Sequence, residues 1–146
     1  MVLGFKEQFR QPIINGLKIH TIRKDRHGRW KSGKKIHFAT GTRTKQYHQF
    51  YEDVCVSVQP IVLVNHGNFV YCRIQTGDNE YIHNDCMEHE NTKRYRGALL
   101  DDLCKNDGLE WEDFKKWFVP NNDDKFVGKI IHWTSFRYEK GAVNNG

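Results

Sequence analysis

Several features that mark particular protein classes are missing from this chain of 146 residues. No apolar run approaches the ~18–20 residues that a membrane-spanning helix needs. The opening residues, MVLGFKEQFRQ, lack the basic-then-apolar order of a secretory leader. Internal repeats and low-complexity tracts are missing as well. We therefore expect a cytoplasmic protein without a membrane partner.

Cysteine is also scarce. The four cysteines, Cys55, Cys72, Cys86 and Cys104, are spread along the chain with no close pair. A secreted disulfide scaffold carries more cysteines in a shorter chain. We expect these thiols to be reduced and mostly to serve as small core residues.

Acidic residues are almost absent from the first third of the chain. Positions 1–50 hold twelve Lys and Arg against Glu7 and Asp25, whereas positions 51–146 hold eleven against sixteen Asp and Glu. A folded domain with one basic and one acidic face follows. A basic face attracts polyanions, so the pattern favours a nucleotide or RNA partner. The alternative is a charged surface that is merely solvated.

The remaining composition is that of one folded domain. Hydrophobic residues make up 38% of the chain and charged residues 28%, the balance of a globular protein rather than a disordered one. A chain of this length is the usual size of one domain. We predict a single domain over residues 1–138 and a flexible C-terminal tail over residues 139–146.

Local patterns predict an α+β domain. A short helix is expected near residues 7–15, ended by Gly16, and two later helices are expected at 98–105 and 111–118. The predicted strands are 18–23, 35–40, 54–64, 69–76, 81–83 and 127–138, while 41–53 and 84–97 are predicted to be loops. Neighbouring strands joined by turns imply mainly antiparallel pairing in a small, barrel-like sheet.

The most informative segment is GLKIHTIRKDRHGRWKSGKKIHF, residues 16–38. It contains the motif Gly16-x-Lys18-x-x-Thr21-x-Arg23, in which a glycine ends a helix and a basic strand follows. In a regular strand Lys18 and Thr21 lie on opposite faces, and a bulge would mix the two faces.

This segment resembles the ASCH domain family, small PUA-like barrels associated with RNA. Besides the motif, the resemblance rests on Phe9, Ile13–Ile14, the turn at Gly33 and the strand Ile36–Phe38. Thr21 stands where the commoner motif has Glu, and the Thr form is similar to the small bacterial N4-acetylcytidine amidohydrolases. Weaker similarity continues at LDDLCKNDGLEWEDFKKW and GKIIHWTSFRY. The resemblance covers most of residues 5–138, with extra stretches near 41–53 and 84–97.

The resemblance implies a PUA-like barrel and a catalytic trio of Lys18, Thr21 and Asp107. The amidohydrolase branch has Glu where this chain has Asp107, a side chain shorter by one methylene. A threonine hydroxyl becomes nucleophilic when a base takes its proton, and a lysine serves as that base once its pKa is lowered. Arg23, or backbone amides near Gly41, would stabilise the oxyanion that develops.

Other residues are candidates for contact with substrate. They follow the motif, end the next strand or lie in the last strand: Arg23, Lys24, Arg26, Gly41, Thr42, Arg43 and His132. The alternatives are an ordinary turn at 41–43 and a structural histidine at 132. Four aromatic residues near the basic segment either stack on a base or anchor the fold: Trp30, Tyr47, Phe50 and Tyr51. Four more at helical spacing are predicted to be core: Trp111, Phe114, Trp117 and Phe118.

A dense run of ligand-type residues occurs in the second predicted loop: His83, Asp85, Cys86, Glu88 and His89. A metal site needs three or four converging ligands, and the sequence offers no second ligand pair. We interpret the run as a polar loop and predict neither a metal nor a cofactor.

These observations lead to one prediction of function and two alternatives. The prediction is an amidohydrolase that removes an acyl group from a pyrimidine nucleoside such as N4-acetylcytidine, acting as a monomer. The first alternative is a non-catalytic RNA-binding module that uses the basic residues 18–45. The second is a nuclease built on the same cleft.

Overall fold

The computed structural model describes residues 1–67, 69–87, 95–96 and 98–140. Within these ranges the chain forms nine strands, two short N-terminal helical turns and two later helices. In chain order they are β1 (Val2–Phe5), η1 (Glu7–Phe9), α1 (Arg10–Ile14), β2 (His20–Arg23), β3 (Lys35–Thr40), β4 (His48–Val54), β5 (Ser57–Asn65), β6 (Phe69–Gly77), β7 (Glu80–Met87), β8 (Tyr95–Arg96), α2 (Ala98–Asn106), α3 (Trp111–Phe118) and β9 (Lys125–His132).

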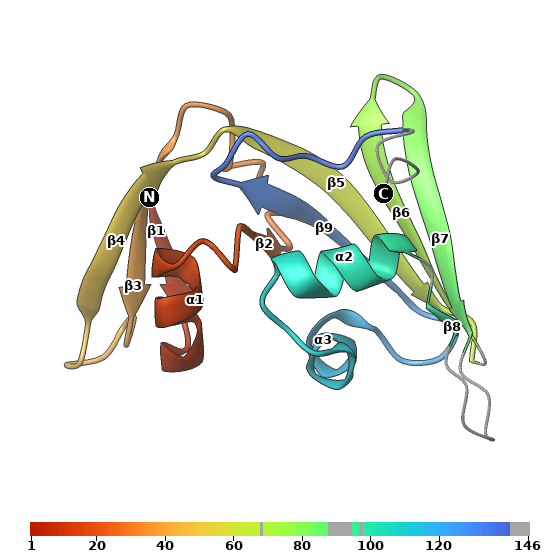
Figure 1. Cartoon of the computed structure of the whole chain (residues 1–146), viewed down its shortest axis with the longest axis horizontal. Coiled ribbons are helices and arrows are strands. Elements are labelled where there is room, and N and C mark those ends of the chain that lie inside the picture. Colours follow the sequence, from red (N-terminus) through yellow and green to blue (C-terminus); the bar gives the residue numbers. More distant parts are fainter. Residues whose placement is uncertain (68, 88–94, 97, 141–146) are drawn as a thin grey trace.

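The strands form two sheets (Figure 1). The smaller has the order β1-β3-β4, with β1 parallel to β3, and the larger has the order β2-β9-β5-β6-β7-β8 with antiparallel pairing throughout. The α+β class and the mainly antiparallel pairing are therefore confirmed. No closed barrel is found among the described strands, since both sheets have open edges.

The helices lie beside the sheets, and a shared core joins the two layers. The turn α1 lies near the smaller sheet, and α2 and α3 lie against the larger one (Figure 1). Phe38 of β3 packs edge-to-face on Trp133, just beyond β9, with ring centroids 4.8 Å apart. Leu100 and Leu103 of α2 and Phe114 of α3 are fully buried. Cys55, Cys72 and Cys104 are buried in this core as expected.

Three predicted boundaries are wrong. Residues 48–53, predicted to belong to the loop 41–53, lie in the strand β4, because an edge strand with mostly exposed side chains lacks hydrophobic alternation. β7 is longer than the predicted 81–83, because it pairs along the full length of β6. The last strand ends at His132 instead of residue 138, and the chain then turns back so that Tyr138 reaches β2.

Some predictions concern residues outside the described ranges. Glu88 and His89 of the ligand-type run and residues 141–146 of the predicted tail lie there, and the side chains of Asp85 and Cys86 are not described either. In the part of the chain that is described, no three His, Cys, Asp or Glu side chains group around one point. None of its helices is long and apolar enough to cross a membrane.

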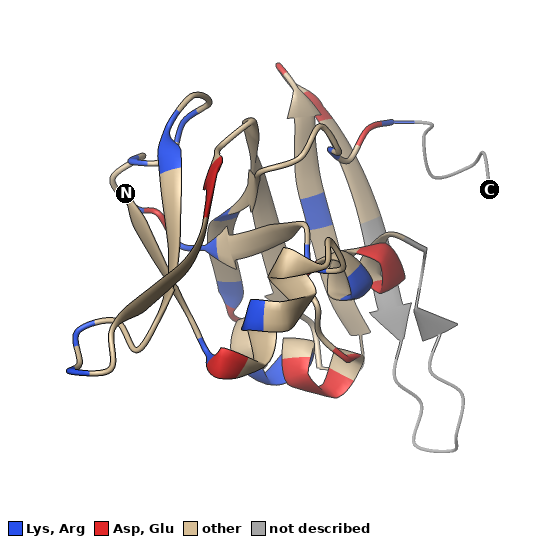
Figure 2. Ribbon diagram, turned by 60° about the vertical axis from the view of Figure 1, so that its left-hand side comes forward, with Lys and Arg blue, Asp and Glu red and all other residues tan. Residues whose placement is uncertain are grey.

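Charge is distributed less simply than the sequence predicts. Acidic positions, red on the ribbon of Figure 2, occur on the helices, where α2 carries Asp101 and α3 carries Glu112 and Asp113. Lys and Arg of the first fifty residues lie on several elements of the molecule, and some of them gather at the groove described below.

Candidate active site

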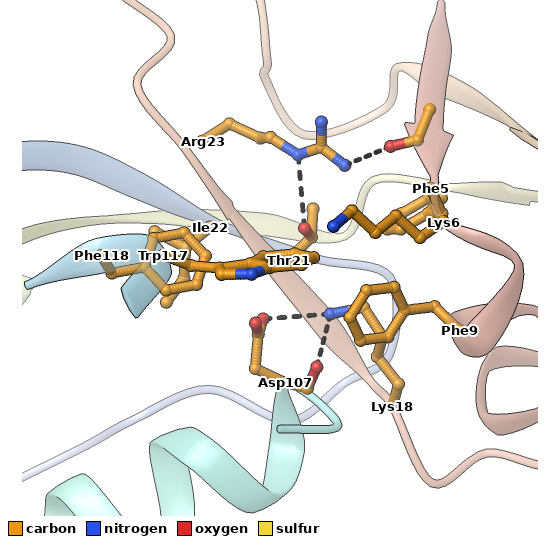
Figure 3. A pocket seen from close by; sticks show the side chains of 11 residues that line it. Phe5, Lys6, Phe9, Lys18, Thr21, Ile22, Arg23, Asp107, Trp117 and Phe118 are labelled. Atoms are coloured by element: carbon orange, nitrogen blue, oxygen red, sulfur yellow. Dashed lines mark hydrogen bonds and ion pairs between the residues drawn. The ribbon is translucent and has the colours of Figure 1, made fainter. Parts of the chain in front are cut away.

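A pocket of about 280 Å³ lies where β1, β2 and the ends of α2 and α3 meet (Figure 3). Its volume is near the lower end for small-molecule sites, which bind ligands in clefts of roughly 300–1,000 Å³. All three residues of the predicted catalytic trio line it, together with Arg23 and several aromatic rings. The lining residues are Gly4, Phe5, Lys6, Phe9, Lys18, Thr21, Ile22, Arg23, Asp107, Trp117 and Phe118.

Lys18 reaches the pocket because the chain turns sharply before β2. Gly16, with φ +76°, ends α1. The backbone amides of Leu17 and Lys18 then donate to Pro12 O at 2.9 and 3.1 Å, and that of Ile19 donates to Asn106 O at 2.9 Å. Lys18 therefore precedes the regular strand, so alternation does not force it onto the face opposite Thr21.

The Lys18 ammonium is buried and paired with Asp107. Its Nζ donates to the Asp107 backbone carbonyl at 2.6 Å and lies 3.2 Å from Asp107 Oδ1, and each side chain is only 2% exposed. The Phe9 ring centroid lies 4.9 Å from Nζ, within cation–π range. Gly108, with φ +74°, follows Asp107, and a Cβ there would lie 3.3 Å from Lys18 Cβ. Glycine thus lets the chain turn tightly over the lysine.

Burial lowers the pKa of Lys18 below its ordinary value, because the charged form loses water. Asp107 opposes this shift by its charge and hydrogen bond, and the positive charge of Arg23 adds to it. The net direction is downward. Lys18 is thus closer to its neutral, basic form than an exposed lysine would be.

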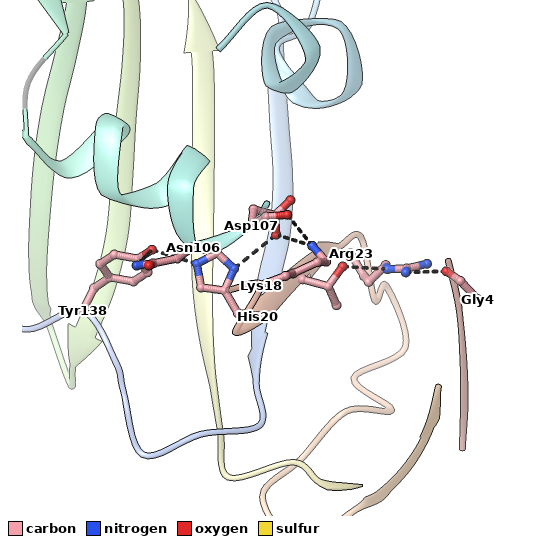
Figure 4. Close-up of polar contacts among 8 residues, drawn as sticks. Gly4, Lys18, His20, Arg23, Asn106, Asp107 and Tyr138 are labelled. Atoms are coloured by element: carbon pink, nitrogen blue, oxygen red, sulfur yellow. Dashed lines mark hydrogen bonds and ion pairs between the residues drawn. The ribbon is translucent and has the colours of Figure 1, made fainter. Parts of the chain in front are cut away.

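A chain of hydrogen bonds continues from Asp107 into the core (Figure 4). His20 Nδ1 lies 3.1 Å from Asp107 Oδ1, His20 Nε2 lies 2.7 Å from the Tyr138 hydroxyl, and Asn106 Nδ2 donates to that hydroxyl at 3.2 Å. The carboxylate paired with Lys18 can only accept, so Nδ1 carries the proton and Nε2 accepts from Tyr138. Burial lowers the pKa of His20, which favours this neutral form.

Thr21 and Arg23 form the opposite wall of the pocket. Arg23 Nε donates to Thr21 Oγ1 at 3.3 Å, and Arg23 Nη2 donates to Gly4 O at 2.7 Å. The guanidinium also lies 5.1 Å from the Phe5 ring centroid. Thr21 is 4% exposed, and its hydroxyl bonds to Arg23 while the Lys18 ammonium bonds to Asp107. The pocket thus contains two polar pairs: the Thr21 hydroxyl with the Arg23 guanidinium, and the buried Lys18 with the Asp107 carboxylate.

The remaining predicted substrate contacts lie outside this pocket. Gly41 and Thr42 line a shallow neighbouring cavity of about 500 Å³, which shares Gly4, Phe5 and Lys6 with the pocket. A Cβ at Gly41 would lie 2.5 Å from Gln46 O, so the turn itself requires glycine there. Arg43 is exposed in the loop after Gly41. Lys24 and Arg26 line a separate groove.

The position of His132 fits the structural alternative rather than a contact with substrate in this pocket. It is fully buried within the larger sheet, and its Nε2 lies 2.9 Å from Gln59 Oε1. Tyr138 N also donates to that oxygen, so Gln59 Oε1 is the acceptor and His132 Nε2 the donor. Nδ1 is buried without a hydrogen-bond partner among the described groups. Burial, with smaller contributions from the charges of His20 and Arg137, lowers the pKa of His132 to about 3.

The aromatic residues of the pocket were not identified from the sequence. Trp117 was predicted to be core, yet it is 42% exposed and lines the pocket, because it lies at the edge of the stripe formed by Trp111, Phe114 and Phe118. Trp30, a stacking candidate, is buried. The spacing of Trp117 within that stripe was the signal available in the sequence.

Comparison with known proteins adds no relative: no family model, no curated protein and no solved structure matches this chain.

Proposed function

We propose that this protein is an amidohydrolase of PUA-like, ASCH-type fold that acts in the cytoplasm on an acylated pyrimidine nucleoside such as N4-acetylcytidine. The observation that carries the proposal is a buried lysine, paired with a carboxylate, in the same small pocket as a threonine hydroxyl. Positions 18 and 21 are close together in the sequence but far from position 107, and folding brings all three to one cavity.

The chemistry follows from the roles that these groups can take. Thr21 Oγ1 attacks the acyl carbon while its proton passes to the neutral Lys18 amine. The carbonyl oxygen becomes anionic, and the Arg23 guanidinium, 3.3 Å from Thr21 Oγ1, supplies a nearby positive charge. The C–N bond then breaks, and Lys18 returns the proton to the leaving amine. An acyl ester remains on Thr21.

Water completes the reaction. A water molecule attacks the ester carbon while Lys18 takes its proton, the ester C–O bond breaks, and the proton returns to Thr21 Oγ1 as the carboxylic acid leaves. Asp107 orients the Lys18 amine through the 3.2 Å contact with its Oδ1 and can hold the proton that the lysine gives up. His20 donates to the same oxygen and keeps it in place.

The shorter side chain of Asp107 is compatible with this role. Compared with glutamate it lacks one methylene, and a displacement of ~1 Å can lower a rate on the order of a hundredfold. Here the turn at Gly108 brings the backbone so close that Asp107 O and Oδ1 both contact Lys18 Nζ. This close approach of the backbone supports the proposed role of Asp107 despite its shorter side chain.

The size and walls of the pocket favour a single base as the reacting group. About 280 Å³ accommodates a small planar group but not a folded RNA. The rings of Phe5, Phe9 and Trp117 line it and offer apolar surface to a flat ligand. The exocyclic amide of an acylated base would then enter between Thr21 and Lys18.

The test is incubation with N4-acetylcytidine and chromatography for cytidine. We expect turnover by the wild type, a loss of about a thousandfold or more in Thr21→Val and Lys18→Met, and normal turnover in Thr76→Val. Thr76 is a matched control, since it is a strand threonine of β6 whose hydroxyl has no hydrogen-bond partner among the described residues. No turnover by the wild type, or equal turnover by Lys18→Met, refutes the proposal.

A second candidate is a non-catalytic RNA-binding module. The observation that favours it is the groove that contains Lys24 and Arg26. This candidate requires salt-dependent RNA binding by a protein that leaves N4-acetylcytidine intact, so the same incubation separates the two functions.

A further inference from the structure

A second, larger hollow adjoins the pocket. This groove has a volume of about 800 Å³ and runs between the loop after β2, the end of α3 and the strand β9. Trp117 and Phe118 line both the groove and the pocket, so the two cavities are neighbours across these rings. A ligand whose base occupies the pocket would therefore place its adjoining groups at the groove.

The groove is predominantly basic. Four cationic and two acidic side chains line it: Lys24, Arg26, Lys125, Lys129, Asp25 and Asp124. Both carboxylates already have partners. Asp25 is 3% exposed, accepts from the backbone amides of Arg29 and Trp30 at 2.9 and 3.1 Å, and lies 3.5 Å from Lys129 Nζ. Asp124 Oδ1 accepts from the backbone amide of Lys125 at 2.8 Å.

Asp25 neutralises Lys129 but not the other cations. Burial alone would raise the pKa of Asp25, yet the two backbone amides and Lys129 outweigh it and hold the pKa below its ordinary value. Asp25 and Lys129 thus form an internal ion pair. Lys24, Arg26 and Lys125 are exposed, and none has an ion pair within the described part of the chain.

The cations of the groove are spread over a longer distance than a single phosphate group can span. Lys125 and Lys129 lie four residues apart on β9, which corresponds to ~13 Å along a strand. Lys24 follows Arg23, the residue that pairs with Lys129 in the sheet, so Lys24 and Lys125 lie toward different ends of the groove. Between them Val127 is 55% exposed and lines the groove, and it offers apolar contact to a base.

We propose that this groove binds the phosphates of a single RNA strand, so that the substrate of the pocket is an acylated cytidine within an oligonucleotide rather than a free nucleoside. The inference rests on the proposed function for the reaction in the pocket. Lys24 and Arg26 would bind phosphate on one side of the reacting nucleotide, and Lys125 would bind a phosphate farther along the strand.

The first experiment compares three substrates with the wild type: N4-acetylcytidine, its 5′-monophosphate, and a pentaribonucleotide with N4-acetylcytidine at its centre. We expect kcat/KM for the pentanucleotide to exceed that of each smaller substrate by at least tenfold. Equal values for the pentanucleotide and the nucleoside overturn the inference. Equal values for the pentanucleotide and the monophosphate also overturn it, because one phosphate would then suffice.

The second experiment measures binding without turnover. Fluorescence anisotropy with a labelled, unacetylated pentaribonucleotide compares the wild type with Lys24→Glu/Arg26→Glu and with the control Lys31→Glu/Lys34→Glu. Both double variants change the net charge equally, but Lys31 and Lys34 are exposed residues outside the groove lining. We expect the groove variant to lose at least tenfold in affinity and its salt slope to fall by about 1.4, since each single-strand phosphate contact contributes ~0.7.

The control decides whether the groove or the total charge is responsible. Retained affinity in Lys31→Glu/Lys34→Glu together with loss in the groove variant supports the inference, whereas equal losses in both variants refute it. Absence of turnover on all three substrates counts against the proposed reaction instead. The binding comparison does not depend on catalysis, so the two failures are distinguishable.

Discussion

The pocket and the groove each contain a Lys–Asp pair, and the two pairs differ in almost everything except composition. Lys18 and Asp107 are each 2% exposed and lie 3.2 Å apart, with His20 on the same carboxylate oxygen. Lys129 is 30% exposed and lies 3.5 Å from Asp25. Both charges of the first pair are shielded from water, so they are stabilised only by their protein partners. In the second pair the lysine is still partly hydrated.

Under the functions proposed above, the first pair acts on chemistry and the cations around the second act on binding, and burial separates the two. A buried pair is a poor source of stability, because desolvation offsets most of its attraction, but burial also lowers the pKa of Lys18. An exposed cation keeps its charge at neutral pH and attracts anions at long range. We therefore expect substitutions in the Lys18–Asp107 pair to change the free energy of unfolding strongly, and substitutions in the Lys129–Asp25 pair to change it little.

The largest effect is expected for Asp107→Leu. This change leaves the Lys18 ammonium buried without its carboxylate, and breaking such a pair costs about 3–5 kcal/mol. Urea unfolding of the variant measures the loss. The double variant Lys18→Met/Asp107→Leu removes both charges and should recover most of that stability while remaining inactive. A double variant as unstable as the single one contradicts our account of the pair.

Acid should destabilise the buried network next. The pKa of His132 is about 3 in the folded protein, against 6.5 as its ordinary value, so the unfolded chain binds a proton that the folded chain refuses. This stability is complete above pH 6.5 and is lost as the pH falls from 6.5 toward 3. Between pH 7 and 5 the loss is about 2 kcal/mol, at ~1.4 kcal/mol per pH unit.

Urea midpoints measured across that range test the prediction. His132→Gln removes the titrating group, so its stability should vary less with pH than that of the wild type. The pKa of His20 is lowered in the same direction, which leaves some acid sensitivity in the variant. An unchanged pH dependence in His132→Gln would show that this imidazole is not held neutral.

A smaller effect is expected for Tyr138→Phe. The change deprives His20 Nε2 of its donor and Asn106 Nδ2 of its acceptor. Leaving buried polar groups unpaired costs about 1–2 kcal/mol. Asp107 still fixes the tautomer of His20, but the ring loses its hydrogen bond on the Nε2 side and with it part of its orientation, so turnover should fall more than the stability loss explains. Thermal unfolding and N4-acetylcytidine kinetics on the same samples check both parts. Phe136→Leu, nearby but 38% exposed, is the control.

The smallest effect is expected for Lys129→Met in the groove. Asp25 keeps its two backbone amide donors when Lys129 is removed. A partly exposed pair contributes about 0.5 kcal/mol, so the urea midpoint should scarcely move. A loss comparable to that of Asp107→Leu would erase the difference between the two regions.

The elements that sequence reasoning predicts well are those with a strong local pattern. The strand 35–40 and the helix 111–118 have the expected bounds, because hydrophobic periodicity and a following Pro120 define them locally. The strand β4 was missed because its pairing partner, not its side chains, makes it a strand. Trp117 was assigned to the core because periodicity does not tell which edge of a helix stripe meets a cavity.

The sequence by itself determined the α+β class and the basic motif, and its resemblance to a known family named Lys18, Thr21 and Asp107 as a candidate set. Only the tertiary structure decided that Lys18 and Thr21 line one pocket, that Asp107 completes it beside His20, and that His132 is buried elsewhere. The local hydrophobic pattern shows whether a segment is a helix or a strand. Which side chains meet across a cavity depends on pairings and turns between distant segments, such as the contact of Ile19 with Asn106.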